Sequence, residues 1–373
     1  MNKNFEIKTP FYISLLTGIF TWLIIIITVS YNYSYSPHIN YYFYFTRSLI
    51  NWDAIWYIKI AIEGYSIDRK VVFFPLLPFL IKIFHIIIND YVISGILISN
   101  ISRIIAAIFF YNLIKNEYNE KIAYTSLILW SISPANIFFV NIYTESLFFM
   151  LSCLFFYFLK DKNFILAAIV AGFAASTKNI GFFISIIFVL EYLRICMANK
   201  QFNIFKIMFL SFVSFSGLIF YSLFLKIKYN DPIYFLNVQE LWHFRHNFSY
   251  PFYALFNSIL NIKSYFSSTI NEKKTIFSFL YTFLSIIFAF YGFKKINFLH
   301  YLFFILIIIT LSLQPTLMSN FRYISGIFTF WIIAAFIFNR YIKTKLLTLT
   351  VYFILLITQI YVILRWFAGF WVA

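Results

Sequence analysis

The chain has 373 residues, of which 62% are hydrophobic and only 11% are charged. A soluble domain carries about 25% charged residues to cover its surface, so this composition excludes an ordinary soluble protein and predicts a multi-pass integral membrane protein. The formal net charge is +16. Its basic residues lie mainly in short connections between apolar runs, which is the positive-inside pattern of membrane proteins and argues against a nucleic-acid partner.

Apolar runs of the kind that cross membranes follow one another along the whole chain. They cover residues 11–29, 73–88, 92–114, 122–140, 143–159, 163–177, 180–193, 205–225, 276–293, 297–313, 323–338 and 346–364. A spanning helix needs about 20 mostly apolar residues. Because several runs are shorter, we predict about 10–12 transmembrane helices in an all-α protein with a single domain, residues 1–373. The first run is interpreted as a membrane anchor that enters from a basic cytoplasmic end.

The connections between the runs are of two kinds. Short basic connections, which are predicted to be cytoplasmic, cover residues 160–162, 194–206, 294–295 and 340–345. Two long loops, residues 30–72 and 226–275, carry Trp, Asp, Glu, His and Pro and are predicted to be extracytoplasmic. The run 73–88 leaves two topologies open. If it spans the membrane, the basic stretch 115–121 lies outside; if it is re-entrant or interfacial, that stretch lies inside.

The stretch 51–65 in the first long loop is rich in polar and aromatic side chains. As a helix, it places Trp52 and Trp56 on one flank and Asp53 on an adjacent face, and it ends at Gly64, a common residue at helix C-termini. Since the stretch is too polar to span, we predict an amphipathic juxtamembrane helix on the outer membrane surface. Asp53 is then either a functional carboxylate or a helix N-cap.

Charged residues interrupt two of the apolar stretches. Glu145 lies between two runs. A carboxylate at membrane depth is a functional candidate by default, although the N-terminus of a helix also favours an acid there. Lys178 and Asn179 break a second apolar stretch, where Lys178 is either a phosphate ligand or a turn residue whose amine reaches towards water.

Polar residues gather again late in the chain. The second long loop contains a group that includes Gln239, Trp242, His243 and Arg245. Gln and Trp side chains offer hydrogen bonds and a stacking face to a sugar, whereas His243 is equally compatible with a surface position. Arg322, followed by Tyr323, opens a late apolar run. This arginine is either a bidentate clamp for a phosphate or an anchor at the lipid headgroups.

Several motifs are absent from the sequence. It has no Gly-rich phosphate loop, no His/Cys metal cluster and no Gly-x-Ser-x-Gly elbow, which argues against an ATP-driven transporter and a serine hydrolase. Cys153 and Cys196 have neither metal-ligand spacing nor a disulfide framework. We therefore expect no metal and no cofactor.

Six short stretches together carry a family resemblance. They are Asn51-Trp-Asp-Ala-Ile-Trp-Tyr to Gly64-Tyr65, Phe73 to Pro78, Ser133 to Ser146, Asp231 to Trp242, Phe321-Arg-Tyr323 and Gly369-Phe-Trp-Val-Ala373. Each stretch is a weak signal alone. In this order, from near the first apolar run to the last residue, they resemble the PIG-V family of mannosyltransferases, within the GT-C glycosyltransferase superfamily.

The resemblance implies transfer of mannose, or a related hexose, from a polyprenyl-phosphate sugar donor to a lipid-linked or cell-envelope acceptor on the extracytoplasmic side. The implied partners are membrane lipids, this donor and a lipid-linked glycan acceptor. In eukaryotic members the reaction adds the second mannose of the GPI anchor. The short chain, and Lys178 where the family more often has Arg, favour a prokaryotic member in a bacterial inner membrane. The alternative location, for a eukaryotic chain, is the endoplasmic reticulum membrane.

An inverting transfer to a hydroxyl needs one carboxylate as general base, and a lipid phosphate leaving group needs cations. We assign Asp53 as the base. Glu145 is a second carboxylate that either supports the residues in contact with the substrate or orients the acceptor. The other predicted substrate-binding residues are Trp52, Lys178, Asn179, Gln239, Trp242, His243, Arg245, Arg322 and Tyr323. Among them, the predicted phosphate ligands are Lys178, Arg322 and Arg245.

Two other classes of function remain open from the sequence. A transporter or flippase for lipid-linked or small solutes shares the many spans and the buried charges. It does not require the amphipathic Trp-Asp helix, and no inverted repeat is visible in the sequence. A structural or assembly membrane protein is the third possibility.

Overall fold

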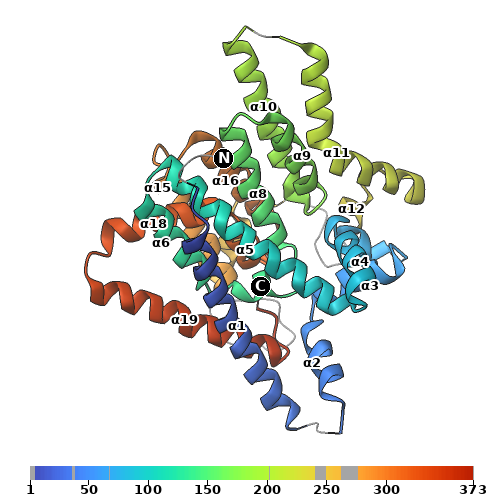
Figure 1. Cartoon of the computed structure of the whole chain (residues 1–373), viewed down its shortest axis with the longest axis vertical. Coiled ribbons are helices and arrows are strands. Elements are labelled where there is room, and N and C mark those ends of the chain that lie inside the picture. The colour runs from blue at the N-terminus through green and yellow to red at the C-terminus, as the bar shows by residue number, and fades with distance from the viewer. Residues whose placement is uncertain are drawn as a thin grey trace.

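The computed structural model describes residues 5–35, 38–66, 68–200, 202–239, 249–261 and 276–372. Within these ranges the chain is helical and forms no β-strand, so the predicted all-α class is confirmed (Figure 1). The α-helices are α1 (Lys8–Tyr33), α2 (Tyr41–Leu49), α3 (Asp53–Glu63), α4 (Leu76–Ile88), α5 (Tyr91–Glu117), α6 (Glu120–Ser131), α7 (Asn136–Val140), α8 (Glu145–Lys160), α9 (Phe164–Ala175), α10 (Phe182–Ala198), α11 (Ile204–Tyr229), α12 (Tyr234–Asn237), α13 (Tyr253–Leu260), α15 (Ile276–Gly292), α16 (Phe298–Ser312), α17 (Asn320–Ser325), α18 (Phe328–Tyr341) and α19 (Lys345–Phe367). Two short 3₁₀-helices are η1 (Asp68–Val72) and η2 (Asn179–Gly181).

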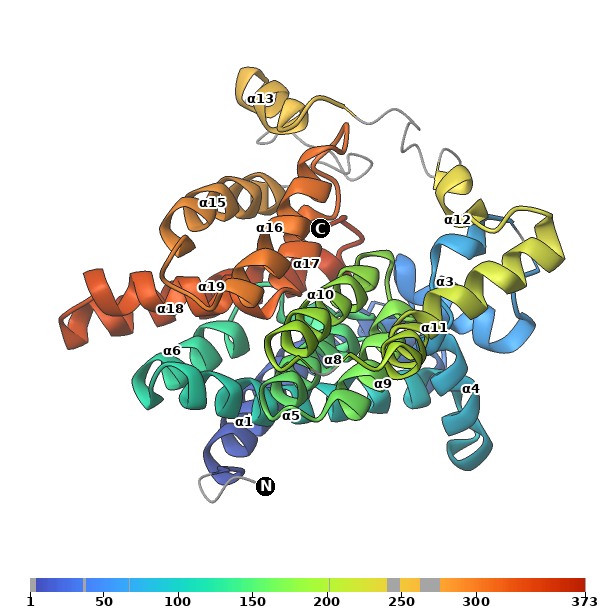
Figure 2. The ribbon, with the colours of Figure 1, turned by 90° about the horizontal axis from the view of Figure 1, so that it is seen from above.

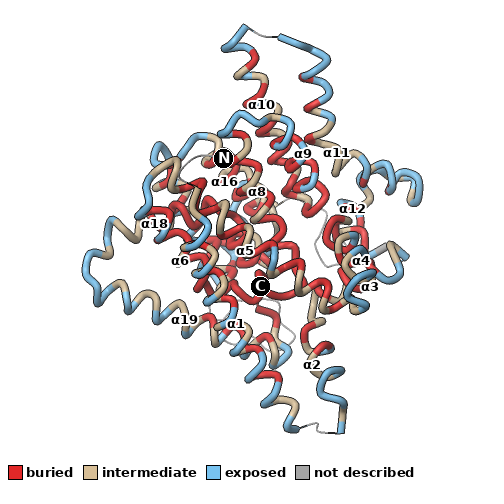
Figure 3. The backbone as a smooth tube through the Cα atoms, in the orientation of Figure 1, coloured by how far each residue is buried: buried red, intermediate tan, exposed pale blue. Residues whose placement is uncertain are grey.

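Several helices present apolar side chains on the outside of the molecule. Examples are Leu16 on α1, Phe205 on α11 and Leu346 on α19, which are 63%, 83% and 75% exposed. Figure 3 shows the buried residues gathered in the middle of the molecule and long exposed stretches on α11 and α19. Since soluble monomers rarely expose large contiguous apolar patches, this surface suits a lipid environment.

Helix length and composition agree with a membrane protein. Among the described residues, five helices are long and apolar enough to cross a membrane: α1, α5, the helix formed by η2 and α10, α11, and α19. Five shorter apolar helices accompany them: α4, α9, α15, α16 and α18. The predicted membrane character is thereby confirmed, and the count of about 10–12 spans stays a prediction.

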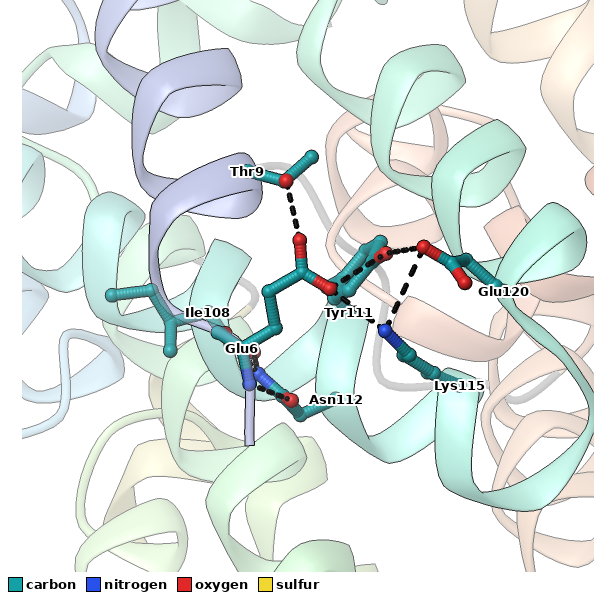
Figure 4. Close-up of polar contacts among 7 residues, drawn as sticks. All are labelled: Glu6, Thr9, Ile108, Tyr111, Asn112, Lys115 and Glu120. Carbon is teal, nitrogen blue, oxygen red and sulfur yellow. Dashed lines mark hydrogen bonds and ion pairs between the residues drawn. The ribbon is translucent and has the colours of Figure 1, made fainter. Parts of the chain in front are cut away.

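The N-terminal end of α1 is attached to the C-terminal end of α5, as Figure 4 shows. The Glu6 carboxylate accepts a hydrogen bond from Lys115 Nζ at 2.7 Å, and the Asn112 side chain donates to the Glu6 carbonyl at 2.7 Å. The bond from Lys115, together with a second one from Thr9, lowers the pKa of Glu6. These contacts place the basic stretch 115–121 on the same side of the molecule as the N-terminus.

Helix α4 does not carry the chain across the bundle. At its start, the Leu76 amide donates to the Ser176 carbonyl at 3.0 Å, and just after its end the Asp90 carboxylate accepts a hydrogen bond from Tyr42 on α2. Figure 1 shows α2, α3 and α4 together on the right, away from the N-terminus. This geometry favours the re-entrant interpretation of residues 73–88, because the stretch 115–121 then lies with the other basic connections.

Two predicted runs are interrupted in the structure. The run 122–140 is divided between α6 and α7, and the turn at 132–135 contains Pro134, which cannot donate a helical hydrogen bond. The run 323–338 is divided between α17 and α18. All five residues of α7 are at most 1% exposed. Non-helical backbone at membrane depth is tolerated only where protein covers it, and these breaks satisfy that condition.

Small residues allow α9 and α11 to pack closely. A Cβ added at Gly217 would lie 2.0 Å from the Gly172 carbonyl oxygen and 2.8 Å from Ser176. Glycine is therefore required at this crossing, as in other close helix contacts in membranes. The contact fixes the C-terminal end of α9, which leads directly into Lys178.

A buried arginine connects three further helices, and the sequence analysis did not single it out. Arg103 on α5 is 2% exposed. It donates to the Ser14 carbonyl, to Thr17 Oγ1 at 2.7 Å and to Asn136 Oδ1 at 3.2 Å. These neutral acceptors join α1, α5 and α7 around one cation.

The described parts of the second long loop are peripheral. Figure 2 shows α12 and α13 at the edge of the helical body. Before α13, the Ser249 amide donates to the Leu313 carbonyl and the Phe252 amide donates to the Ser312 carbonyl, both at 2.9 Å. The loop is thus attached to the C-terminal end of α16.

Candidate active site

Four charged side chains from distant parts of the sequence meet in the structure. Asp53 and Glu145 are the first residues of α3 and α8, Lys178 lies just before η2, and Arg322 lies in α17. Arg322 forms an ion pair with Asp53, and its Nε lies 3.3 Å from Glu145 Oε1. Lys178 Nζ bonds the same Glu145 oxygen at 2.6 Å. The four groups form one continuous network of alternating charge.

The Asp53 side chain is more exposed than the other three members of the network. The side chains of Glu145, Lys178 and Arg322 are 1%, 7% and 8% exposed, and that of Asp53 is 17% exposed. Buried charges are tolerated when they are paired, and here two carboxylates face two cations. Burial lowers the pKa of Lys178, and Glu145 opposes this shift. Lys178 and Arg322 both point into the protein. Lys178 is therefore not a turn residue whose amine reaches towards water, and Arg322 is not an anchor at the lipid headgroups.

Asp53 does not act as a helix cap. The N-cap of α3 is Trp52, and no side chain there bonds a backbone amide of the helix. One Asp53 oxygen, Oδ2, contacts Arg322. The other, Oδ1, accepts no hydrogen bond from the part of the chain that the structure describes. Within the described structure, this arrangement leaves one carboxylate oxygen without a partner beside a cation.

Unusual backbone conformations precede both helices that carry the Asp53–Arg322 pair. Trp52, before α3, has φ 57° and ψ −120°, and Ser319, before α17, has φ 68°. Positive φ is uncommon for residues other than glycine and costs about 1–3 kcal/mol. Such strain tends to occur at functional sites, where surrounding contacts hold it in place. Here the two positions lie one residue before Asp53 and three residues before Arg322, and both line the cavity described below.

A cavity of about 220 Å³ opens on this network. Seven of the residues predicted from the sequence line it: Trp52, Asp53, Lys178, Asn179, Gln239, Arg322 and Tyr323. Glu145 lies behind the lining, bonded to Lys178 and Arg322. Trp242, His243 and Arg245 lie outside the described residues. The structure therefore brings together eight of the eleven predicted site residues.

Other lining residues were missed by the sequence analysis. They are Trp56, Tyr57, Val72, Phe73, Phe74, Thr177, Gln314, Met318, Ser319 and Trp371. Trp371 had one signal, since it belongs to the C-terminal stretch of the family resemblance. Tyr57 follows Asp53 by one helical turn, which places both on the same face of α3.

Aromatic rings surround the charged groups. Lys178 Nζ lies 4.6 Å from the centre of the Tyr323 ring, and the Arg322 guanidinium lies 5.3 Å from that of Tyr143, both within the range of cation–π attraction. Trp52 and Trp371 meet edge to face, with ring centres 5.1 Å apart. Both indole N–H groups are buried without a hydrogen-bond partner among the described residues. They are donors available to a bound polar molecule.

Helix α3 packs one of its faces on the protein, and its predicted position at the outer membrane surface stays a prediction. Its residues Ala54, Tyr57 and Ile60 are at most 6% exposed, and Trp56 stacks on Phe73 with ring centres 6.2 Å apart. The apolar face of α3 therefore packs on protein. The helix does end at Gly64, as expected, with φ 70° there.

Across the described ranges, no group of three or more His, Cys, Asp and Glu side chains is placed to hold a metal ion. Cys153 and Cys196 are both buried free thiols.

Comparison with solved structures gives a distant match. The chain is similar to the oligosaccharyltransferase of Archaeoglobus fulgidus, solved with a tethered acceptor peptide, at 14% sequence identity and a TM-score of 0.43. The match covers 86% of this chain and 51% of the archaeal protein, so the chain spans about half the length of that enzyme. No curated protein matches the chain.

Comparison with protein families gives a direct result. The model of the PIG-V mannosyltransferase family matches residues 29–231, which is more than half of the 373 residues. The matched range contains Asp53, Glu145 and Lys178, and Arg322 lies beyond it. The chain is therefore a member of the PIG-V mannosyltransferase family, and a membrane glycosyltransferase.

Proposed function

We propose that this enzyme transfers mannose from a polyprenyl-phosphate donor to a hydroxyl of a lipid-linked or cell-envelope acceptor, with inversion at the anomeric carbon. The observation that carries the proposal is the Asp53 carboxylate, which lines the cavity with one oxygen on Arg322 and the other without a partner among the described residues. Family membership supplies the class of reaction. Donor, stereochemistry and acceptor are the proposed parts.

In the proposed reaction, Asp53 Oδ1 takes the proton of the acceptor hydroxyl. The acceptor oxygen then bonds the anomeric carbon of mannose while the bond from that carbon to the phosphate oxygen breaks. The bonding electron pair leaves with the lipid phosphate. A positioned carboxylate base of this kind contributes about 10²–10⁴-fold to a rate. Arg322, on Asp53 Oδ2, fixes the direction of the free oxygen.

The lipid phosphate needs positive charge as it leaves. Arg322 and Lys178 both line the cavity and are the cations proposed for this task. Each already contacts Glu145, which therefore holds the two cations at a fixed separation. Glu145 is buried behind them, so its proposed role is to position these cations rather than to touch the acceptor.

The sugar is proposed to lie against the tryptophan pair. Trp52 and Trp371 offer two buried indole donors without partners in the described structure, and Gln239 adds an amide to the same cavity. Apolar residues such as Phe73 and Met318 complete the lining, as expected for a site that also holds the start of a prenyl chain.

The proposed enzyme is multi-pass, with the site on the extracytoplasmic side. Cysteine labelling should test this topology in a variant that lacks the two native cysteines. We expect Ser34→Cys, after α1, to react with an impermeant reagent from outside, and Asn199→Cys, after α10, to react only from inside. Labelling of both positions from one side would contradict the model.

A transfer assay tests the reaction itself. Purified enzyme in nanodiscs, given labelled polyprenyl-phosphate mannose and a lipid extract of the host, should produce a labelled lipid or envelope glycan. Labelled GDP-mannose serves as the control donor and should give no product. Transfer from GDP-mannose alone would overturn the proposed donor, and transfer from neither would overturn the proposed acceptor class. Membership of a transferase family favours this reaction over the transporter or flippase alternative.

A further inference from the structure

A second cavity lies at the other end of the helices that form the active site. Its volume is about 660 Å³, and it is lined by the C-terminal ends of α5, α8 and α10 and by the start of α16. Helix α8 begins at Glu145 and ends at Lys160 after 16 residues, a length of about 24 Å. The two cavities therefore face opposite ends of the bundle, and nothing in the mannosyl transfer uses the second one.

The charges around this cavity are unequal. Four basic side chains line it, Lys160, Lys162, Arg194 and Lys295, against two acidic ones, Glu117 and Glu191. Both carboxylate oxygens of Glu191 accept hydrogen bonds, whereas Glu117 Oε2 is buried without a hydrogen-bond partner among the described residues. Arg194 holds Glu191 in two hydrogen bonds of 2.7 Å, and Glu117 lies 3.3 Å from His300 and 3.9 Å from Lys160.

Two of the lysines remain available. Lys162 and Lys295 are exposed and form no ion pair with a carboxylate of the described chain. The excess of two positive charges is matched by a phosphate monoester, which carries about 1.5–2 negative charges near pH 7. A carboxylate or a phosphate diester carries only one.

The remaining walls of the cavity suit a lipid. Phe156, Leu159, Ile195 and Leu299 lie between the charged groups and offer an apolar surface to an acyl chain. Basic cavities between helices at a membrane surface are known sites for phosphorylated lipid headgroups. We propose that this cavity binds a phosphate monoester at the membrane surface, carried by a lipid such as phosphatidate.

Native mass spectrometry of the purified enzyme in detergent can test this site by titration with single lipids. We expect phosphatidate to be retained more strongly than phosphatidylglycerol, and phosphatidylcholine least. The variant Lys162→Gln/Lys295→Gln should bind phosphatidate about 25-fold more weakly, since each basic side chain near an anionic lipid contributes roughly five-fold. Both side chains are exposed, so the melting temperature should stay near that of the parent.

A matched variant separates a site from general surface charge. Lys343→Gln/Lys345→Gln removes the same charge from the connection before α19 and from the first residue of that helix, outside the cavity. This variant should retain phosphatidate like the parent. The proposal would be overturned if both double variants lost phosphatidate binding equally, or if Lys162→Gln/Lys295→Gln bound phosphatidate like the parent. Millimolar glycerol 3-phosphate is then added as a competitor. If it displaces phosphatidate from the parent but not from Lys162→Gln/Lys295→Gln, the phosphate site is supported and its ligand is assigned to a soluble phosphate monoester. None of these readouts depends on mannosyl transfer.

Discussion

Asp53→Asn should lower mannosyl transfer at least about 100-fold, because an amide cannot take the proton of the acceptor hydroxyl. The substitution keeps the size and shape of the side chain, and its amide oxygen can still accept a hydrogen bond from Arg322. Binding of the lipid-phosphate donor should therefore stay close to that of the parent. The measurement is transfer per folded enzyme in nanodiscs, with donor binding determined separately.

The control for this experiment is Glu63→Gln, at the other end of α3. Glu63 pairs with Lys70, which lowers the pKa of Glu63, and its side chain is 52% exposed outside the cavity. This variant should transfer mannose at nearly the parental rate per folded enzyme, with a lower melting temperature because Lys70, whose side chain is 0% exposed, loses its carboxylate partner. If Asp53→Asn also retains activity within a few-fold, Asp53 is not the base. Glu145 then becomes the next candidate, although it is 1% exposed behind two cations.

Arg322→Gln should damage both stability and activity. The change leaves Asp53 and Glu145 with Lys178 as their shared cation, and breaking a buried pair by removing one partner costs about 3–5 kcal/mol. Loss of a donor to the departing phosphate should also reduce the rate about 10²–10³-fold. We expect a clear fall in the melting temperature in detergent, together with loss of transfer in the fraction that remains folded.

Two companion variants separate these effects. Arg322→Lys keeps the charge but not the planar fork of donors, so it should retain most of the stability and only part of the activity. In Glu145→Gln/Arg322→Gln, one carboxylate is removed with its cation, so stability should recover while transfer stays low. If Arg322→Gln kept both the melting temperature and the transfer rate of the parent, the charged network would contribute neither to stability nor to catalysis.

The sequence predicted the charged members of the site for a simple physical reason. Only 11% of residues are charged, so Glu145 and Lys178 stood out against the apolar runs on either side. The aromatic members had no such contrast, because 24% of the chain is Phe, Trp or Tyr. Trp371 and Tyr57 belong to stretches that carry the family resemblance, but nothing in their composition distinguished them as site residues, and the structure was needed to place them in the cavity.

The helical class followed from composition, but the course of individual helices did not. The break between α6 and α7 had Pro134 as its only signal within a continuous apolar run. The position of α4 depends on contacts such as that between Leu76 and Ser176, which are 100 residues apart in the chain. Contacts between such distant residues are fixed by tertiary packing, and no local sequence pattern predicts them.

The ion pair between Asp53 and Arg322 joins residues 269 positions apart, and this separation has a consequence for biogenesis. A chain emerging from the ribosome presents Asp53, Glu145 and Lys178 long before α17 is made. Until then the nascent bundle holds two carboxylates and a single cation, an imbalance that disfavours closing the network. The last elements to enter the membrane thus complete the site. A protein interrupted before Arg322 should be recognised as unassembled by membrane quality control rather than persist as a weak enzyme.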